Sequence, residues 1–139
     1  DHVIVTATQP LAATVLKLTG GRGVDVIVDA ISGPIVAELA ECAAPRGRIF
    51  LYGRLDERPT VYPLVVCMKK ALSIIGYTLW EIVLDAARRR EAERWIVDHL
   101  ERGSFAPVIH RTFAFDDIVA AHACMDANQA NGKIVVTVP

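Results

Sequence analysis

Cysteine, histidine, tyrosine and carboxylate side chains are the groups of this sequence that could carry out chemistry. Cys42, Cys67 and Cys124 are far apart and form no CxxC pair, so local spacing assembles no zinc site. We expect each cysteine to be a small buried hydrophobe. An odd number of cysteines without a disulfide framework is typical of a reducing compartment, which predicts a cytoplasmic protein.

The histidines and carboxylates fall into no catalytic pattern. His122 lies on an apolar face of a predicted helix and is interpreted as a core histidine. Asp116 and Asp117 precede that helix, which favours an N-cap over a carboxylate dyad. Tyr52 or Tyr77 could donate a proton to a carbonyl oxygen, but no sequence neighbour would lower either pKa. We therefore assign neither a catalytic residue nor a metal ligand to this chain.

The balance of charges disfavours two classes of partner. The chain has 15 basic and 16 acidic residues, so no net field attracts nucleic acid or an anionic membrane. The arginine run at residues 88–90 is flanked by Asp85, Glu91 and Glu93, which favours a solvated helix face over a nucleic-acid patch. No apolar run approaches the length of a membrane span. We expect no nucleic acid and no membrane as partner.

A glycine-rich run at residues 20–23 follows a predicted helix and precedes a predicted strand. A phosphate-binding loop has the reverse order, since it leads from a strand into the N-terminus of a helix. We therefore interpret this run as a turn and not as a phosphate site.

A strand-helix-strand unit between Gly23 and Gly53 organises the chain. Its first strand, residues 24–31, is apolar on both faces, as in a parallel sheet that helices cover on both sides. Pro34 suits a first helical position, apolar residues then recur at helical spacing, and Pro45 is expected to end the helix. The second strand is residues 48–53. This unit predicts an α/β fold with a right-handed crossover.

Further elements are predicted on both sides of this unit. Residues 1–6 have the pattern of a short strand, and Thr8 or Gln9 is a candidate cap for the helix that follows. One or two helical turns are expected over Leu64 to Lys70. The strand Leu72 to Leu79 would be the sheet edge, and its isoleucines and tyrosine invite pairing. A second copy meeting this edge about a two-fold axis would continue the sheet, so we expect a homodimer.

The C-terminal part departs from the earlier alternation of strands and helices. Residues 81–102 predict a helix that ends at Gly103, with a buried stripe formed by Ala92, Trp95, Ile96 and Leu100. A strand at residues 108–113, a helix capped by Asp116 and a strand at residues 133–138 follow. This strand-helix-strand segment is expected to pack apart from the main sheet.

Ligands of open parallel sheets bind beyond the carboxyl ends of the strands, where backbone groups are unpaired. In the central unit, these ends are Ala30-Ile31-Ser32 and Tyr52-Gly53-Arg54.

Five stretches then occur in a characteristic order: DHVIVT, LTGGRGVDVIVDAISG, APRGRIFLYG, KKALSIIGYTLWE and FAPVIHRTFAFDDIVAAHACMDANQANGKIVVTV. Singly each is a weak signal, since GRGVDVIVD is only a loop and a buried strand. Together they resemble the C-terminal portion of the medium-chain dehydrogenase/reductase superfamily, the zinc-type alcohol dehydrogenases and quinone oxidoreductases. The resemblance covers essentially the whole chain.

The resemblance implies a particular domain organisation. Residues 1–103 would be the second half of a dinucleotide-binding, Rossmann-like domain, and residues 104–139 would return to a GroES-like catalytic domain. In the family's strand order, 3-2-1-4-5-6, the chain would supply strands three to six. The family's first two strands and its GxGxxG phosphate turn do not occur in this sequence. We therefore expect a C-terminal fragment of a longer enzyme.

The resemblance also implies cofactor contacts at the ends of three strands, of which the last two approach the nicotinamide. Backbone N–H and C=O groups can bind a carboxamide whatever the side chains are, so an ordinary strand end is the alternative at any single position. The implied residues are Ala30, Ile31, Ser32, Tyr52, Gly53, Arg54, Tyr77, Thr78 and Leu79.

Asn131 and Lys133 match an asparagine and a lysine that lie near the cofactor in quinone-reductase-like members. A lysine beside a pyrophosphate would form charge-assisted hydrogen bonds. The alternative is a turn followed by a surface lysine.

The implied activity is hydride transfer between NADP or NAD and a small-molecule substrate that is an alcohol, carbonyl or quinone. Quinone-reductase-like members mostly use NADPH, and zinc is an option in the full-length protein, with no ligands from this chain. The alternative is a non-catalytic, dimerising α/β module that binds no cofactor on its own. An upstream GxGxxG turn would favour the enzyme, and a native start at Asp1 would favour the module. The 139-residue chain alone is expected to bind dinucleotide weakly or undetectably.

Overall fold

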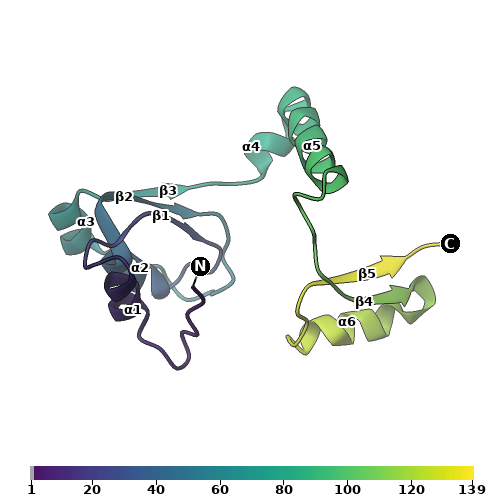
Figure 1. Ribbon diagram of the computed structural model, residues 1–139, viewed down its shortest axis with the longest axis horizontal. Helices are drawn as coiled ribbons and strands as arrows, with labels where there is room; N and C mark the ends of the chain where they lie inside the picture. The colour runs from purple at the N-terminus through teal and green to yellow at the C-terminus, as the bar shows by residue number, and fades with distance from the viewer. Residues whose placement is uncertain (1) are drawn as a thin grey trace. The chain divides into compact units, whose positions relative to one another are not determined.

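The structure is a computed structural model that describes residues 2–139 (Figure 1). Contacts divide the chain into two compact units, one that extends up to Asp85 and one that spans Ala86–Pro139. The first unit has a three-stranded parallel sheet and the second a two-stranded parallel sheet. The predicted α/β class is thereby confirmed. The predicted domain boundary after residue 103 stays a prediction.

The sheet of the first unit contains β1 (Val24–Asp29), β2 (Ala43–Leu51) and β3 (Ser73–Gly76), in the order β1-β2-β3. The predicted strand-helix-strand unit and the edge position of the third strand are confirmed. Both sides of the sheet end in an unpaired strand, because β1 and β3 each pair only with β2 among the described residues.

Helices α1 (Leu11–Leu18), α2 (Ile35–Cys42) and α3 (Leu64–Lys70) accompany this sheet. Helix α1 packs against α2, and both α2 and α3 contact β2 (Figure 1). The core lies between α2 and β2, where Val36, Ala40 and Ile49 have no exposed surface. The apolar spacing that predicts α2 thus places its buried side chains against the central strand.

Helix α2 ends earlier than the sequence predicts. We expected Pro45 to end it, but the last helical residue is Cys42 and β2 already begins at Ala43. The Nζ of Lys70 explains the early end, since it donates to the carbonyls of Ala40, Glu41 and Ala43 at 3.2, 2.7 and 3.0 Å. An ammonium group that caps free carbonyls stabilises a helix C-terminus.

One face of the first sheet is open, which corrects the prediction of a strand buried on both faces. Val26 and Val28 of β1 are 46% and 67% exposed, whereas Ile49 of β2 is fully buried. Successive side chains alternate between the faces of a sheet. Within the described residues, the helices of this unit therefore cover only the face to which Ile49 points.

The N-terminal predictions are wrong in two respects. Residues 2–5 form no strand, and Val3 and Val5 are exposed, because no described strand lies beside them to pair with. Asp1 lies outside the described residues. Neither Thr8 nor Gln9 caps α1; both instead hydrogen-bond to Val5, and Pro10 occupies the N-cap position without a side-chain bond.

The predicted helix over residues 81–102 is two helices, α4 (Trp80–Val83) and α5 (Ala86–Glu101). Gly103 follows α5 with a φ of 69°, in agreement with the predicted end. The predicted buried stripe is wrong for the described residues. Trp95, Ile96 and Leu100 are 54%, 47% and 43% exposed, because no element of the second unit packs over them.

The rest of the second unit comprises β4 (Ile109–Ala114), the short 3-10 helix η1 (Phe115–Asp117), α6 (Ile118–Asp126) and β5 (Lys133–Thr137). Helix α6 packs against the parallel pair β4 and β5, and Phe113 and Ala121 are buried between them. The separate strand-helix-strand segment predicted from the sequence is therefore present.

Two smaller predictions for α6 are wrong. The N-cap position falls on Asp117 and not Asp116, and no side chain bonds to the helix N-terminus. His122 is exposed and not a core residue, because it lines an open hollow beside Ile134 and Val136 of β5. No helix within residues 2–139 is long and apolar enough to cross a lipid bilayer.

Candidate functional site

Parallel pairing brings the carboxyl ends of the first three strands to one edge of the sheet. Asp29 pairs with Leu51, and Leu51 pairs with Gly76, so the three strands end level with one another. The nine residues predicted at these ends follow directly, in three groups: Ala30 to Ser32, Tyr52 to Arg54, and Tyr77 to Leu79. The N–H groups of Tyr52 and Tyr77 still donate to the neighbouring strands, to Asp29 O at 3.0 Å and Leu51 O at 2.9 Å.

The carboxylate of Asp29 shapes the loop that follows β1. Its two oxygens accept hydrogen bonds from the N–H groups of Ile31 and Ser32, both at 2.9 Å. Asp29 is 6% exposed and Ser32 is 7% exposed, so this turn is buried. Ser32 has a φ of 59°, in the left-handed region that serine rarely adopts. The buried carboxylate thus holds the backbone of the loop in a conformation that it would not adopt alone.

The loops after β1 and β2 are tied directly to each other. The Ser32 hydroxyl donates to the carbonyl of Gly53 at 2.7 Å, and Leu55 N–H donates to Ala30 O at 3.3 Å. Gly53 lies so close that a Cβ there would be 2.5 Å from Ala30 O. Only glycine permits this approach of two backbones.

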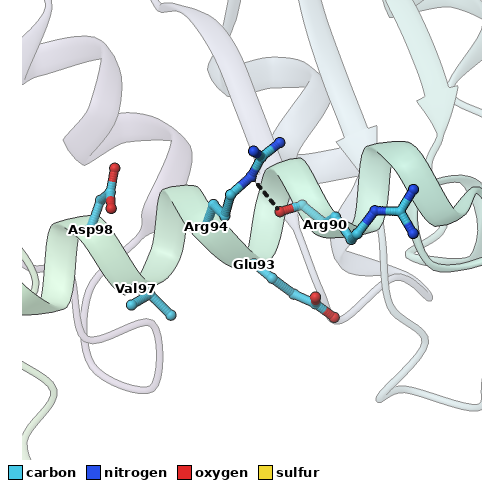
Figure 2. Close-up of a pocket in the computed structure, with 5 residues that line it drawn as sticks. All are labelled: Arg90, Glu93, Arg94, Val97 and Asp98. Carbon is cyan, nitrogen blue, oxygen red and sulfur yellow. Dashed lines mark hydrogen bonds between the residues drawn. The ribbon is translucent and has the colours of Figure 1, made fainter.

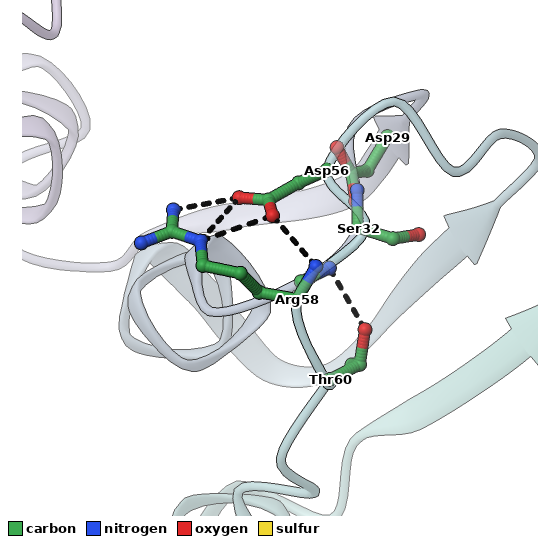
Figure 3. A network of polar contacts seen from close by, with 6 residues as sticks. Asp29, Ser32, Asp56, Arg58 and Thr60 are labelled. Carbon is green, nitrogen blue, oxygen red and sulfur yellow. Dashed lines mark hydrogen bonds and ion pairs between the residues drawn. The ribbon is translucent and has the colours of Figure 1, made fainter.

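A second set of contacts lies further along the same two loops (Figure 3). Asp56 N–H donates to Ile31 O at 2.9 Å, and Gly33 N–H donates to the Thr60 hydroxyl at 2.8 Å. The carboxylate of Asp56 also accepts hydrogen bonds from the guanidinium and backbone N–H of Arg58. The side-chain bonds of Arg58 lower the pKa of Asp56 from 3.8 to about 2, so that this carboxylate stays charged at a lower pH than an unpaired one.

A pocket of 670 Å³ opens beside Ile31, between α1, α2 and the loop after β2. Its walls are largely apolar, and carboxylates and one guanidinium also line it. The lining residues are Thr6, Leu11, Asp29, Ile31, Pro34, Ile35, Glu38, Leu39, Asp56 and Arg58. A pocket of this size, with apolar walls and a few polar groups, has the usual properties of a small-molecule site.

A second, open hollow of 410 Å³ lies on the uncovered face of the sheet and is lined by Val28, Phe50, Tyr52 and Tyr77. The two predicted tyrosines are thus brought together at the end of the sheet. Both side chains are about half exposed, at 53% and 43%.

Thr78 and Leu79 lead from β3 into α4. The Thr78 carbonyl accepts a hydrogen bond from Glu81 N–H at 3.2 Å, and Leu79 occupies the N-cap position of α4. In the loop after β2, the Arg54 guanidinium donates to the Glu57 carbonyl at 3.4 Å. These side chains remain exposed at the sheet edge.

Asn131 and Lys133 belong to the second unit, in the turn that enters β5. Gly132 between them has a φ of 118°, and a Cβ there would be 2.5 Å from Val108 O. Lys133 N–H donates to the same carbonyl at 2.7 Å, and both predicted side chains are exposed. The turn is therefore well defined, and its two polar side chains point outward.

The arginine run lies on α5, where Figure 2 shows Arg90, Glu93, Arg94, Val97 and Asp98 around a shallow hollow of 370 Å³. The Arg94 guanidinium donates to Arg90 O at 3.3 Å. Basic and acidic side chains alternate along this helix, as predicted for a solvated helix face.

The described residues do not fit a bound zinc ion. No three His, Cys, Asp or Glu side chains within residues 2–139 lie close enough together to hold a metal. Cys42 and Cys67 are buried free thiols, as predicted, and Cys124 is half-buried. Burial raises the pKa of Cys42, which disfavours the thiolate that zinc requires.

Sequence reasoning missed several residues that shape this edge. The role of Asp29 could have been predicted from the sequence, since an Asp at the end of a strand and shortly before Ser-Gly favours a turn that its carboxylate stabilises. Thr60 and Asp56 carry no such signal, because they reach the loop after β1 from positions more than 20 residues away, and Arg58 bonds to Asp56.

Comparison with known proteins gives a consistent result. A zinc-binding dehydrogenase family matches residues 1–136. The 2-haloacrylate reductase of a Burkholderia species is 28% identical over 97% of this chain and 41% of that protein. A phenolphthiocerol/phthiocerol polyketide synthase component of Mycobacterium tuberculosis is 27% identical over 100% of this chain and 6% of that protein.

Solved structures agree with these matches. The structure of 2-haloacrylate reductase has a TM-score of 0.83 at 28% identity, and covers 97% of this chain and 42% of its own. A protein assigned as an NADPH:quinone reductase from Bacillus thuringiensis has a TM-score of 0.80 at 28% identity, with the same coverage. The chain spans about two fifths of the length of these reductases. The chain belongs to the zinc-binding dehydrogenase family and corresponds to the C-terminal portion of enzymes of the medium-chain dehydrogenase/reductase superfamily.

Proposed function

We propose that this chain supplies the nicotinamide side of the dinucleotide site of an NAD(P)(H)-dependent reductase. The observation that carries the proposal is the meeting of three strand ends at one edge of a parallel sheet, where Ser32 and Gly53 tie two of the loops together. Ligands of open parallel sheets bind at such an edge. The family match and the reductases among the similar proteins support the same assignment.

The cofactor contacts are backbone groups in this proposal. Ala30, Ile31 and Ser32 line one part of the dinucleotide, and Tyr52, Gly53 and Arg54 with Tyr77, Thr78 and Leu79 line the nicotinamide end. Several backbone groups of these segments already bond within the chain, among them the Ser32 N–H and the Gly53 carbonyl. The carboxamide is therefore proposed to meet backbone groups that remain unpaired, such as the Arg54 N–H. When bound, the nicotinamide ring supplies or accepts the hydride. The chain's own residues bind it, orient it and keep its position fixed.

We place the adenosine end of the cofactor in the 670 Å³ pocket beside Ile31. Leu11, Ile35 and Leu39 provide apolar walls for a flat ring, and the carboxylate of Glu38, which also lines the pocket, would accept from a ribose hydroxyl. The pocket adjoins Ile31 and Asp29, so one extended ligand could pass from it along the strand ends. Within the second unit, Asn131 and Lys133 are proposed as a phosphate contact in their own right, where the ammonium group would neutralise charge.

The proposed substrate is a small molecule with an electron-poor conjugated system, such as an unsaturated carbonyl compound or a quinone. Two similar proteins are named for a haloacrylate and for a quinone, both of which can accept hydride into a conjugated carbonyl system. The alternative substrate is a simple carbonyl compound, or an alcohol that gives its hydride to the oxidised cofactor in the reverse reaction. A dimer through the β3 edge and a cytoplasmic location, in which free cysteines stay reduced, complete the proposal.

The test uses the complete open reading frame that encodes this chain. We expect the purified product to oxidise NADPH or NADH in the presence of a quinone or a 2-haloacrylate, measured by the loss of dinucleotide absorbance. Residues 1–139 expressed alone serve as a control and should bind dinucleotide at least about 100-fold more weakly, because they contain no glycine-rich turn that leads from a strand into a helix. Absence of both turnover and dinucleotide binding in the complete product would contradict the proposal and favour the dimerising module.

A further inference from the structure

The hydroxyl of Ser32 is directed into the chain and not towards a ligand. It donates to the carbonyl of Gly53 at 2.7 Å, and the residue is 7% exposed. A group so placed has little surface left with which to contact a cofactor. Its hydrogen bond joins two loops that are 21 residues apart in the sequence.

A buried carboxylate fixes the conformation of Ser32. Its φ of 59° is uncommon for serine and persists only where the surroundings impose it. The carboxylate of Asp29 imposes it, since its two oxygens accept the N–H groups of Ile31 and Ser32 at 2.9 Å each. The residue whose hydroxyl donates to Gly53 is therefore itself fixed by hydrogen bonds to the buried carboxylate of Asp29.

The acceptor side of this bond is equally constrained. The backbone of Gly53 lies against Ala30 O so closely that no side chain fits, and Leu55 N–H donates to that same oxygen at 3.3 Å. The peptide group between Gly53 and Arg54 is planar. A hydrogen bond to its carbonyl therefore also sets the direction of the Arg54 N–H, which makes no hydrogen bond within residues 2–139.

We propose that Ser32 is a positioning residue for hydride transfer, whose side chain acts through Gly53 and does not touch the cofactor. Held by Asp29, its hydroxyl fixes the peptide between Gly53 and Arg54 against the nicotinamide end of the dinucleotide. This inference rests on the proposed function. It assigns to the Ser32 hydroxyl an indirect role in the orientation of the ring, beside the backbone contact expected from the sequence.

The test compares Ser32→Ala with Thr14→Val in the complete reading frame. The Thr14 hydroxyl also donates to a carbonyl at 2.7 Å, that of Pro10, but it lies on α1 and outside the site. We expect Ser32→Ala to lower kcat about tenfold, with less than about a threefold change in the KM for the dinucleotide, because a misplaced donor slows chemistry more than binding. The primary isotope effect with dinucleotide deuterated at C4 should rise. Thr14→Val should retain wild-type kcat and isotope effect.

A second variant separates the hydroxyl from the strained backbone. Ser32→Gly removes the hydroxyl but suits the left-handed conformation, so we expect it to fold and to show the same loss of kcat as Ser32→Ala. If either folded variant kept the kcat and isotope effect of Thr14→Val, the positioning role would be wrong while the proposed function stood. If the wild-type product neither bound nor oxidised a dinucleotide, the proposed function and this inference would both be wrong.

Discussion

Single carboxylates hold the loops at the carboxyl edge of the first sheet. Asp29 is buried and receives two backbone N–H groups, whereas Asp56 lies in the next loop and receives the guanidinium of Arg58. Each carboxylate therefore orders the loop in which it lies. The roles of these residues could be predicted from the sequence only in part, because Asp29 bonds to near neighbours while Thr60 bonds to a residue 27 positions away.

The pair Asp56–Arg58 makes a prediction about pH. Folding lowers the pKa of Asp56 from 3.8 to about 2, so the pair stabilises the folded loop above the unfolded pKa, and this contribution is lost as the pH falls towards 2. Arg58→Gln should return the pKa of Asp56 towards 3.8, measured by NMR titration of its carboxyl carbon. Arg22→Gln is the control, since Arg22 pairs with Asp25 and should leave Asp56 unaffected. An unchanged Asp56 titration in Arg58→Gln would contradict the assignment.

Gly53 supports a prediction about the close contact between two loops. In Gly53→Ala the new Cβ would lie 2.5 Å from the backbone oxygen of Ala30, so one of the loops must move. We expect the free energy of unfolding to fall by about 1–3 kcal/mol, measured by chemical denaturation. Gly76→Ala is the matched control, because no atom lies within 4 Å of its Cβ position. Equal stability of the two variants would show that the loops are not in contact.

At the scale of elements, strands and helices were predicted well wherever the apolar pattern was continuous. The strands β1, β2 and β3 and the helices between them occur in the predicted order. The ends of the helices were predicted less well. The early end of α2 depends on Lys70, which is 27 residues or more from the carbonyls that it binds. Capping rules consider only residues close in sequence, so they cannot predict a helix end that depends on a distant lysine.

The Lys70 side chain is predicted to stabilise the end of α2. Lys70→Met keeps the aliphatic stem but removes three hydrogen bonds to the end of α2 and the start of β2. We expect the free energy of unfolding to fall by about 1–3 kcal/mol, because the carbonyls lose a charged donor. Lys69→Met is the control on the same helical turn, where the side chain is exposed. A loss of stability no larger than that of the control would contradict the capping role.

At the scale of the whole molecule, the largest difference from the sequence expectation is the amount of exposed apolar surface. Val28 on the sheet and Trp95 on α5 were predicted to be buried, yet they are 67% and 54% exposed. A periodic pattern predicts which face of an element is apolar, but burial also requires a neighbour. The described residues supply no element over either surface within its own unit. Such patches are typical of surfaces that another segment or chain covers.

The edge of β3 gives the last prediction. The N–H of Tyr77 points towards β2, so by alternation the N–H of Gly76 points outward, to the side where a second copy would pair. Gly76→Pro removes this outward donor without removing a hydrogen bond to β2. If the dimer forms through this edge, Gly76→Pro should shift the complete protein towards monomer in light scattering, whereas Gly76→Ala should remain dimeric. A dimer that persists in Gly76→Pro would place the interface elsewhere, since a continuous sheet cannot form across a proline at that position.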